Sequence, residues 1–347
     1  MLWLWALVSS FDAIVGIEVP KAPSYQVSGE ALVVEDGSGH RLAGLGKELL
    51  VRACGETLCA PLNQLQFPVR MASEQAITVN GKKLRGGVWF YLRDDGIRAV
   101  NRLLLEDYLV ATVGSEMPKA FPAEALKAQA VVSRTYALSR TMRREGEVVQ
   151  LASSTLDQVY NGLSHESPET RAAVSATHGQ VLVFDHEPIE AFFFSSCGGR
   201  TRDARLVFGV DQPYLRGVVC GHCDDAATAT WSRRLSFAEL SSKLGFKVTG
   251  ASTEGETADG RPKWVVFKPS ATKVTPEALR AKLGYTVIKS PQMTVQCTGT
   301  VCTFSGRGAG HGVGMCQFGA RGLALQGLGY VDIVQTYFPG ATLKTLY

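Results

Sequence analysis

The segment Pro122–Arg144, PAEALKAQAVVSRTYALSRTMRR, predicts a long helix at the centre of the fold. Pro122 stands where a helix accepts proline, in its first turn, and Glu124 lies beside the positive end of the helix dipole. Small and aliphatic side chains recur at helical spacing along one face, so this helix can pack closely against its neighbours. Arg134 interrupts the apolar part of the helix, and a mid-helix arginine is usually solvated.

The chain before this helix has the pattern of an antiparallel β region. From Tyr25 to about Val100, short alternating runs of apolar residues are separated by turn signals. These turn signals are Asp36-Gly37, Asn80-Gly81 and Asp95-Gly96. Pairs of this kind connect antiparallel strands. A short helix beginning near Glu106 is then expected to lead to Glu116.

The chain after the long helix mixes helices and strands. A helix followed by a strand is expected over residues 172–184, and Ile189–Phe194 is predicted to be another strand. Two amphipathic helices, near Ser236–Leu244 and Pro276–Leu283, flank a polar, glycine-rich stretch and indicate a small inserted subdomain. We therefore predict an α+β fold that is β-rich, with antiparallel hairpins, a central long helix and an inserted α/β subdomain.

The chain length suggests about two domains, and the patterns divide it into five segments. The expected segments are a degenerate signal segment at 1–17, a β-rich N-terminal region at 18–72, the first part of a core at 73–230, the insertion at 231–290 and the closing part of the core at 291–347. The apolar start Met1–Val8 is similar to an export signal but lacks the usual basic residues. A buried N-terminal strand is the alternative interpretation.

The composition is that of a globular protein, with 45% hydrophobic and 20% charged residues. The net charge of +4 suits an anionic partner but is small for 347 residues. The chain has no basic run of the kind that binds nucleic acid, and no apolar stretch reaches the roughly 18 residues of a membrane span. These patterns argue against a nucleic-acid-binding protein and against a transmembrane protein.

A glycine-rich run around one histidine, Gly310–Ala320, indicates a functional site. Glycine tolerates positive φ and lets backbone N–H groups approach a ligand, so such a run is more often a pocket wall than a strand. A tight turn with a surface histidine is the alternative. Far upstream, Gly114-Ser115-Glu116-Met117-Pro118 places a lone acid in an apolar setting just before the long helix.

These segments resemble motifs of the stage II sporulation protein D (SpoIID/LytB) family. The matching segments, in order, are Gly114–Pro118 with the helix around Arg134, Phe194–Thr201, Gln212–Arg216 and Gly310–Ala320. The similarity runs from about Asn101 to Gly340. It implies a lytic transglycosylase that cuts the glycan strands of peptidoglycan and prefers strands stripped of their stem peptides. Some members of the family are instead described as enhancers of a cell-wall amidase.

The resemblance also implies roles for individual residues. Glu116 matches the catalytic acid, and the residues expected to bind substrate are Arg134, Ser195, Ser196, Thr201, Tyr214, Arg216 and His311. For three of these residues the alternative is a structural role: capping a turn for Thr201, packing alone for Tyr214, and orienting a loop or lying in the core for His311. Arg216 stands where a lysine is common, which keeps the charge and changes the hydrogen-bond geometry.

A single carboxyl group is enough for a lytic transglycosylase, whereas an ordinary glycosidase needs two. The 6-hydroxyl of N-acetylmuramic acid is the nucleophile, so Glu116 can protonate the glycosidic oxygen and then accept the hydroxyl proton. Val113, Met117 and Phe121 are expected to form an apolar pocket that raises the pKa of this acid. Arg134 and the start of the long helix act in the opposite direction, so the sequence does not give the sign of the net shift.

Four of the eight cysteines form two closely spaced pairs. Cys54 and Cys59, and likewise Cys297 and Cys302, are five residues apart around a turn, so a disulfide is expected in each pair. Disulfides indicate an oxidising compartment, and we expect an exported protein of the periplasm or cell-wall space. Two pairs of reduced, half-buried cysteines are the alternative.

The other four cysteines suit a metal site. Cys220 and Cys223 have the spacing of a zinc knuckle, and Cys197 and Cys316 lie inside the glycine-rich motifs. Together they can form a tetrahedral structural zinc site, with His222 as a substitute ligand. Phe194 stands where the family usually has a histidine, which argues against histidine ligation at that position. Disulfides among the same cysteines remain open, since the protein is expected to be exported.

Two functions from different classes follow from these patterns. The first is a peptidoglycan lytic transglycosylase that uses Glu116 and acts on glycan strands. The second is a non-catalytic wall-binding protein that enhances an N-acetylmuramoyl-L-alanine amidase, which would be its partner. A cysteine hydrolase using Cys197 or Cys316 with His311 is disfavoured, because the positions of these cysteines suit metal binding or disulfide formation.

Overall fold

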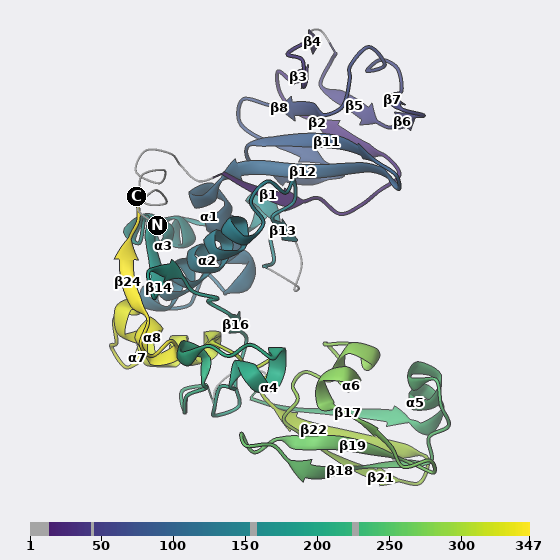
Figure 1. The fold of residues 1–347 in the computed structure, drawn as a ribbon, viewed down its shortest axis with the longest axis vertical. Helices are drawn as coiled ribbons and strands as arrows, with labels where there is room; N and C mark the ends of the chain where they lie inside the picture. Colours follow the sequence, from purple (N-terminus) through teal and green to yellow (C-terminus); the bar gives the residue numbers. More distant parts are fainter. Residues whose placement is uncertain (1–13, 43–44, 153–157, 224–228) are drawn as a thin grey trace. The chain divides into compact units, whose positions relative to one another are not determined.

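The computed structural model describes residues 14–42, 45–152, 158–223 and 229–347 (Figure 1). The chain divides into two compact units. The first ends at Glu190 and also contains Leu343–Tyr347, and the second spans Ala191–Thr342. Helices and antiparallel sheets occur in both, which confirms the α+β class. Among the described residues, no helix is both long enough and apolar enough to cross a membrane.

The N-terminal half of the first unit is built on a seven-stranded sheet, in the order β13-β1-β12-β11-β8-β3-β4. Its strands are β1 (Ile14–Glu18), β3 (Val33–Asp36), β4 (Arg41–Leu42), β8 (Val69–Ala72), β11 (Gly87–Arg93), β12 (Gly96–Leu104) and β13 (Leu151–Ala152). β11 and β12 form the hairpin predicted around Asp95-Gly96, with Arg93 paired to Gly96. All pairs are antiparallel except β1 with β13.

A second, four-stranded sheet has the order β10-β9-β2-β5. Its strands are β2 (Tyr25–Ser28), β5 (Glu48–Val51), β9 (Ile77–Val79) and β10 (Lys82–Leu84), and a separate small hairpin consists of β6 (Ala53–Cys54) and β7 (Thr57–Leu58). The hairpin predicted at Asn80-Gly81 joins β9 to β10, and both turn residues have positive φ, as a tight hairpin turn requires. A Cys54–Cys59 disulfide closes the β6–β7 hairpin.

The predicted signal segment at 1–17 falls only partly on described residues. Residues 1–13 lie outside them. From Ile14 onward the chain forms β1, which pairs with β12 along its whole length and buries Val15 and Ile17. The described part of this segment therefore belongs to the sheet, as the alternative interpretation of a buried strand expects.

The remainder of the first unit packs around the long helix α2 (Ala123–Arg143), which has nearly the predicted bounds. Its other elements are α1 (Leu105–Glu116), the 3-10 turn η1 (Gly162–His165), α3 (Pro168–Ala176), β14 (Gln180–Phe184), β15 (Glu187–Pro188) and β24 (Thr342–Thr345). α2 contacts α1, α3 and β14, and most residues from Ala125 to Ser139 are buried. The helix is thus buried on several sides, whereas the sequence pattern predicted one apolar face.

Arg134, in the middle of α2, is fully buried and forms an ion pair with Glu106 of α1. Its Nε and Nη2 donate to the two carboxylate oxygens at 2.6 and 2.8 Å. Its remaining N–H groups reach the carbonyl oxygens of Val174 and Gln180 at 3.3 and 3.2 Å. The Tyr347 hydroxyl donates to Glu106 at 2.7 Å. One buried ion pair therefore joins α1, α2, the end of α3, β14 and the returning segment of the chain.

The second unit carries the glycine-rich motifs on short elements. These are β16 (Phe193–Phe194), α4 (Ala204–Phe208), the 3-10 turn η2 (Pro213–Leu215), β23 (Met315–Cys316), α7 (Gln317–Leu325) and α8 (Tyr330–Tyr337). The strand predicted at Ile189–Phe194 is shorter than expected, because the ladder that it forms with β23 consists of Phe193 and Phe194. The pairing is parallel and places Phe194 opposite Cys316.

The inserted subdomain consists of two three-stranded sheets and two helices. Its elements are β17 (Thr230–Ser236), α5 (Phe237–Leu244), β18 (Gly250–Glu256), β19 (Pro262–Lys268), β20 (Thr272–Val274), α6 (Pro276–Leu283), β21 (Met293–Thr298) and β22 (Val301–Arg307). Ser236 and Glu239 form a capping box at the start of α5, and both helices match their predicted positions. The sheet β17-β22-β21 extends to Arg307, beyond the end of the predicted insertion at residue 290.

The core of this subdomain is apolar and local. Phe267, Leu279, Ile288 and Phe304 are fully buried within it, and the Cys297–Cys302 disulfide joins the ends of β21 and β22. The subdomain therefore has its own core, which indicates that it can hold a fixed shape.

We expect Glu106→Gln to lower the free energy of unfolding by about 3–5 kcal/mol at pH 7, because it leaves the Arg134 guanidinium buried without a counter-charge. Urea unfolding measures the change. Glu145→Gln, which removes an exposed carboxylate just after α2, is the matched control and should shift the stability by less than about 0.5 kcal/mol. Equal stabilities of the two variants would contradict the assignment.

The same comparison has a predicted dependence on pH. Burial alone would raise the pKa of Glu106, but the hydrogen bonds and charge of Arg134 outweigh it, and the pKa lies below its usual value. A carboxyl whose pKa is lowered by folding stabilises the protein above its unfolded pKa of about 4.3, and this contribution is lost as the pH falls through the folded pKa. The gap between wild type and Glu106→Gln should therefore narrow between about pH 5 and pH 3; a gap that does not change would refute the linkage.

Candidate functional site

Glu116 is the last residue of α1, and its carboxylate is held by the backbone of a distant segment. Its Oε1 accepts a hydrogen bond from the Val159 N–H at 2.6 Å. The neighbouring Ser115 hydroxyl donates to Ala111 and accepts from the Asn161 N–H at 3.3 Å, so the end of α1 is attached to this segment twice. The Glu116 side chain is half-buried. This arrangement fixes the position of an acid that remains partly accessible to solvent.

The apolar surroundings expected for Glu116 are partly present along the chain. Val113 and Met117, on either side of it, are buried, whereas Phe121 is half-buried. Gly114 allows η1 to pack closely against the last turn of α1, because a Cβ at this position would lie 1.9 Å from the His165 carbonyl oxygen. A larger residue at 114 would push η1 away from the helix end that carries the acid.

Arg134 lies in the same unit as Glu116, but its guanidinium is used within the protein. Its guanidinium contacts Glu106 and the ends of α3 and β14, and its side chain is fully buried. The structure therefore gives this residue a role in holding helices together. Its assignment to substrate binding stays a prediction.

The four cysteines predicted to bind a metal lie together in the second unit. Cys197, Cys220, Cys223 and Cys316 are all buried, and their sulfur atoms lie within 4.8 Å of one another. None of them is in a disulfide. Cys197 and Cys223 have sulfurs 3.4 Å apart. Tetrahedral zinc with Zn–S bonds of about 2.3 Å separates its sulfurs by about 3.8 Å, so this donor set fits the ion.

Backbone N–H groups and a tyrosine hydroxyl lie against the sulfurs of the cysteine cluster. The backbone N–H groups of Cys197 and Gly319 donate to the Cys316 sulfur, each at 3.2 Å, and that of Gly199 donates to Cys197 at 3.3 Å. Cys316 is also the N-cap of α7, where the helix dipole favours negative charge. The Tyr337 hydroxyl lies 3.2 Å from the Cys220 sulfur. In metal sites, hydrogen bonds of this kind to the ligand atoms orient the ligands and stabilise their charge.

The thiols of this cluster have unequal proton affinities. A hydrogen bond from Cys197 lowers the pKa of Cys223, and burial raises the pKa of Cys316. His222, the predicted substitute ligand, lies outside the cluster in the structure, and its Nδ1 is 3.1 Å from the Gln326 side-chain amide. The four cysteines alone offer four sulfur atoms, the number of ligands that a structural zinc site needs.

Ser195, Ser196 and Thr201, which flank Cys197, are fixed by backbone hydrogen bonds. Ser195 accepts from the Phe318 N–H at 3.0 Å, and Ser196 forms a two-way bridge with Ala309 at 3.0 and 2.8 Å. Ser196 and Thr201 are both buried.

The Thr201 hydroxyl accepts from the Val218 N–H at 2.7 Å, a contact between segments that are 17 residues apart. These residues therefore tie the Cys197 motif to the glycine-rich run and to Val218.

Tyr214 and Arg216 lie in and just after η2. Tyr214 is 4% exposed, so most of its ring packs inside the protein. Arg216 has 38% of its side chain exposed and pairs with Asp211 and with Asp203, the latter at 3.8 Å. Of these two predicted binding residues, Arg216 is the one that a ligand in solution can reach.

His311 uses both ring nitrogens within the protein. Its Nδ1 accepts from the Val313 N–H at 3.1 Å, so the proton is assigned to Nε2, which donates to the Phe193 carbonyl at 2.9 Å. The rings of Phe194 and Phe208 lie 5.4 and 5.3 Å away. Burial lowers the pKa of His311 to about 4. A neutral histidine held in this way orients the loop, which is one of the roles expected for it.

The glycines around His311 permit close contacts with the protein itself. A Cβ at Gly314 would lie 2.0 Å from the Phe192 carbonyl oxygen, and one at Gly312 would lie 2.7 Å from Cδ of Arg202. Both have positive φ, at 79° and 91°. The glycines therefore let the backbone of this run approach Phe192 and Arg202, which lie on either side of the Cys197 motif.

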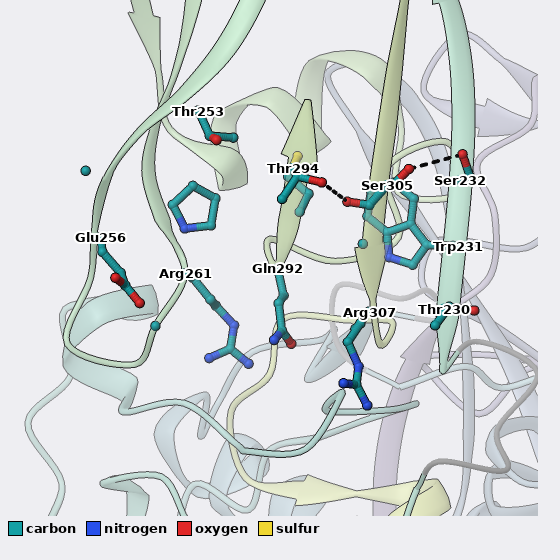
Figure 2. Close-up of a pocket in the computed structure, with 15 residues that line it drawn as sticks. Thr230, Trp231, Ser232, Thr253, Glu256, Arg261, Gln292, Thr294, Ser305 and Arg307 are labelled. Atoms are coloured by element: carbon teal, nitrogen blue, oxygen red, sulfur yellow. Dashed lines mark hydrogen bonds between the residues drawn. The ribbon is translucent and has the colours of Figure 1, made fainter. Parts of the chain in front are cut away.

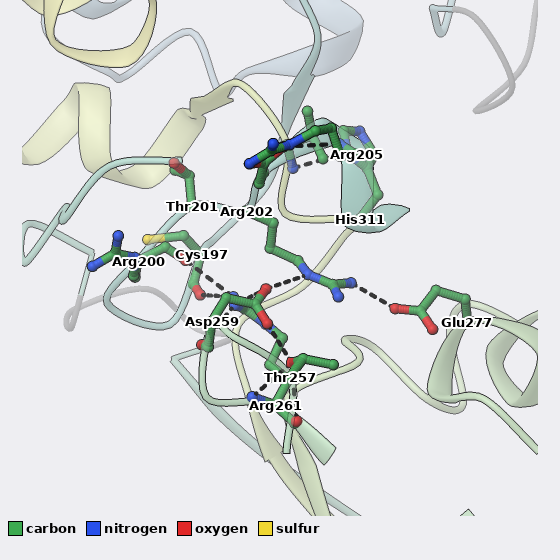
Figure 3. Close-up of polar contacts among 12 residues, drawn as sticks. Cys197, Arg200, Thr201, Arg202, Arg205, Thr257, Asp259, Arg261, Glu277 and His311 are labelled. Atoms are coloured by element: carbon green, nitrogen blue, oxygen red, sulfur yellow. Dashed lines mark hydrogen bonds and ion pairs between the residues drawn. The ribbon is translucent and has the colours of Figure 1, made fainter. Parts of the chain in front are cut away.

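Arg202, which sequence reasoning missed, is the centre of a buried polar network (Figure 3). Its Nε donates to Asp259 at 2.7 Å and its Nη1 to Glu277 at 2.6 Å, while its backbone N–H donates to Gly312 at 2.7 Å. Asp259 also pairs with Arg261 at 2.8 Å. The network attaches the inserted subdomain to both glycine-rich motifs. Arg202 directly follows the recognised Thr201, but no sequence pattern links it to Asp259.

The structure groups the predicted residues by unit. Glu116 and Arg134 belong to the first unit. The residues of the second unit are Ser195, Ser196, Thr201, Tyr214, Arg216, His311 and the four clustered cysteines. Within the second unit, the Cys197 motif, His311 and the cysteine cluster are brought together by direct hydrogen bonds.

Comparison with known proteins identifies the family. A family model described as "Stage II sporulation protein" matches residues 93–184, which include Glu116 and Arg134. Stage II sporulation protein D of Bacillus subtilis is 33% identical over 265 residues, which cover 71% of this chain and 76% of that protein. An uncharacterized protein of Brachyspira hyodysenteriae is 33% identical over 276 residues, covering 78% and 75%.

A further relative carries a different name. The protein named amidase enhancer of Bacillus subtilis is 32% identical over 290 residues, which cover 68% of this chain and 40% of that longer protein. The similarity to both kinds of protein extends well beyond the segment matched by the family model. The chain belongs to the stage II sporulation protein D family.

Proposed function

We propose that this protein is a peptidoglycan lytic transglycosylase that cleaves the bond between N-acetylmuramic acid and N-acetylglucosamine in glycan strands freed of stem peptides. The observation that carries the proposal is the placement of Glu116. This acid ends α1, is half-buried and is held at 2.6 Å by the Val159 N–H. It also lies within the segment matched by the family model. A fixed, accessible acid is what a one-carboxyl mechanism requires.

The proposed reaction needs no water. The protonated Glu116 gives its proton to the glycosidic oxygen as the bond to C1 of the muramyl ring breaks. The 6-hydroxyl of the same sugar attacks C1, and the Glu116 carboxylate takes the hydroxyl proton. The acid is thereby regenerated, and the products are a 1,6-anhydro-N-acetylmuramic acid end and a free N-acetylglucosamine end. Because the 6-hydroxyl of the sugar closes the anhydro ring, the reaction needs no second carboxylate to activate water or to attack the sugar.

The other predicted site residues divide into two roles. Arg216 is exposed and suits a carboxylate of the substrate, since a guanidinium can donate two parallel hydrogen bonds. Thr201, Ser196 and His311 are engaged by backbone groups and act by holding the shape of the loops. Substrate contact is thus assigned to Arg216, and loop positioning to the other three.

We also propose that Cys197, Cys220, Cys223 and Cys316 hold a structural zinc ion. Four buried sulfurs at mutual distances up to 4.8 Å, with three backbone N–H groups donating to them, support this assignment. Zinc in such a site would crosslink the Cys197 motif, the knuckle and the start of α7, and it would take no part in the chemistry.

Export to the periplasm or cell-wall space is part of the proposal. The Cys54–Cys59 and Cys297–Cys302 disulfides support it, because disulfides persist in oxidising compartments.

A second function is favoured by one observation. The similarity to the protein named amidase enhancer supports a non-catalytic protein that binds the wall and stimulates an amidase partner. The two functions differ in what they require of Glu116, because an enhancer would not need this acid for chemistry.

The Glu116→Gln variant is expected to produce no detectable 1,6-anhydro ends from stem-free glycan strands, because loss of general acid–base catalysis costs about 10²–10⁴-fold in rate. Mass spectrometry of the digestion products measures this. Glu145→Gln should match the wild type. Reducing-end N-acetylmuramic acid from the wild type would exclude the one-carboxyl mechanism. Wall binding by both proteins without any anhydro product would favour the enhancer.

Purified protein is expected to contain about one zinc ion per chain, because four clustered cysteines form one tetrahedral site. Elemental analysis measures the metal, and Cys220→Ser should lose it and unfold at lower urea concentration. The double variant Cys54→Ser/Cys59→Ser, which leaves the cluster intact, should keep it. Protein with no zinc and no free thiols would mean that these cysteines form disulfides.

A further inference from the structure

The inserted subdomain contains an open groove with a volume of about 830 Å³ (Figure 2). One side is formed by β17, β21 and β22, and the other by β18 and the start of β19. The groove lies entirely within the second unit. None of the site residues predicted from the sequence lines it.

The lining of the groove is rich in hydroxyl groups. They belong to Thr230, Ser232, Thr253, Thr294 and Ser305. At one end, Arg261, Gln292 and Arg307 gather side by side, and the acidic side chain of Glu256 lies apart from Gln292 and Arg307 (Figure 2). Arg261 is already paired with Asp259, so Arg307 is the cation and Glu256 the acid that set the small net charge of the lining. A phosphate backbone requires a much denser set of cations, and an apolar peptide requires apolar pockets, so the lining suits a hydroxyl-rich, weakly acidic chain.

Two buried polar atoms in the lining lack a partner among the described residues. These are the Nε–H of Arg261, a residue that is 3% exposed, and the Oε1 of Gln292. Buried donors and acceptors are nearly always paired in folded proteins, so these two atoms mark a place where a bound water or a group of a ligand can complete the hydrogen bonding. One donor and one acceptor complement the C=O and N–H of an acetamido group.

The basic end of the groove is built against the Cys197 motif. Nη2 of Arg261 donates to the carbonyl oxygens of Arg200 and Cys197, at 3.0 and 3.5 Å. A Cβ at Gly198 would lie 2.7 Å from Gln292 Oε1 and 3.0 Å from Cβ of Arg307. The groove therefore begins at a loop that matches the family's site and runs outward over the subdomain.

We propose that this groove binds a length of N-acetylated, carboxylate-bearing glycan chain. Arg307 would pair with a sugar carboxylate, the Arg261 and Gln292 end would receive an acetamido group, and the hydroxyl-lined part would receive the next sugar. The identity of the polymer, a stem-free glycan strand, rests on the proposed function. The groove would make the protein bind long strands more tightly than short ones.

Binding is tested with full-length protein carrying Glu116→Gln, so that strands stay intact, and with stem-free glycan strands sorted by length. Adding Arg307→Ala should weaken binding of long strands about tenfold, the effect of one charge-assisted hydrogen bond. Arg234→Ala, an exposed arginine on β17 that does not line the groove, is the matched control and should bind as the parent does. Thr294 is an exposed position on β21, so Thr294→Trp would fill the groove from that strand and should weaken binding without removing a charge.

The outcomes separate this inference from the proposed function. If Arg307→Ala and Thr294→Trp both bind long strands like the parent, or if the parent does not bind strands saturably, the groove proposal is overturned. If both variants bind more weakly while protein with an intact Glu116 yields no anhydro ends, the groove stands and the transglycosylase proposal fails.

Discussion

The second unit depends on the buried pairing of Arg202 with Asp259. An arginine that is 2% exposed is tolerated only with a counter-charge, and Asp259 supplies one that it shares with Arg261. Arg202 also donates its backbone N–H to Gly312, so the residue that holds Asp259 is attached to the glycine-rich run as well. His311 and Cys316 lie in that same run. The polar stretch of the insertion thus acts as a support for the motifs of the family.

The glycines of the two motifs allow close packing of the protein against itself, because protein atoms occupy the space beside them. At Gly312 and Gly314 the space beside the backbone is taken by Arg202 and by the Phe192 carbonyl, and at Gly198 by Gln292. Such glycines let three loops lie in contact, and this closeness allows four sulfurs to converge from separate parts of the chain. The shape of these loops, the spacing of the four sulfurs and the end of the groove are therefore coupled.

The sequence predicted the features that local physics determines. α2, α5 and α6 follow from helical spacing and caps, the hairpin at Asn80-Gly81 follows from its turn, and the α+β class follows from these elements. What it did not predict comes from contacts between distant residues. The ion pair of Arg134 with Glu106 spans 28 residues, and that of Arg202 with Asp259 spans 57. The pairing of β17 with β22 likewise joins segments far apart in the sequence, and periodicity within a strand does not identify such a partner.

The return of the chain to the first unit has a consequence for biosynthesis. Leu343–Tyr347 belong to that unit, β24 adds to the sheet of β14, and the Tyr347 hydroxyl reaches Glu106. The ribosome makes the first 190 residues of this unit early, yet its last contacts exist only after the whole second unit has been translated. During that interval the edge of β14 lacks β24, and the Glu106 carboxylate lacks the hydroxyl of Tyr347. Chaperones bind incompletely folded chains of this kind.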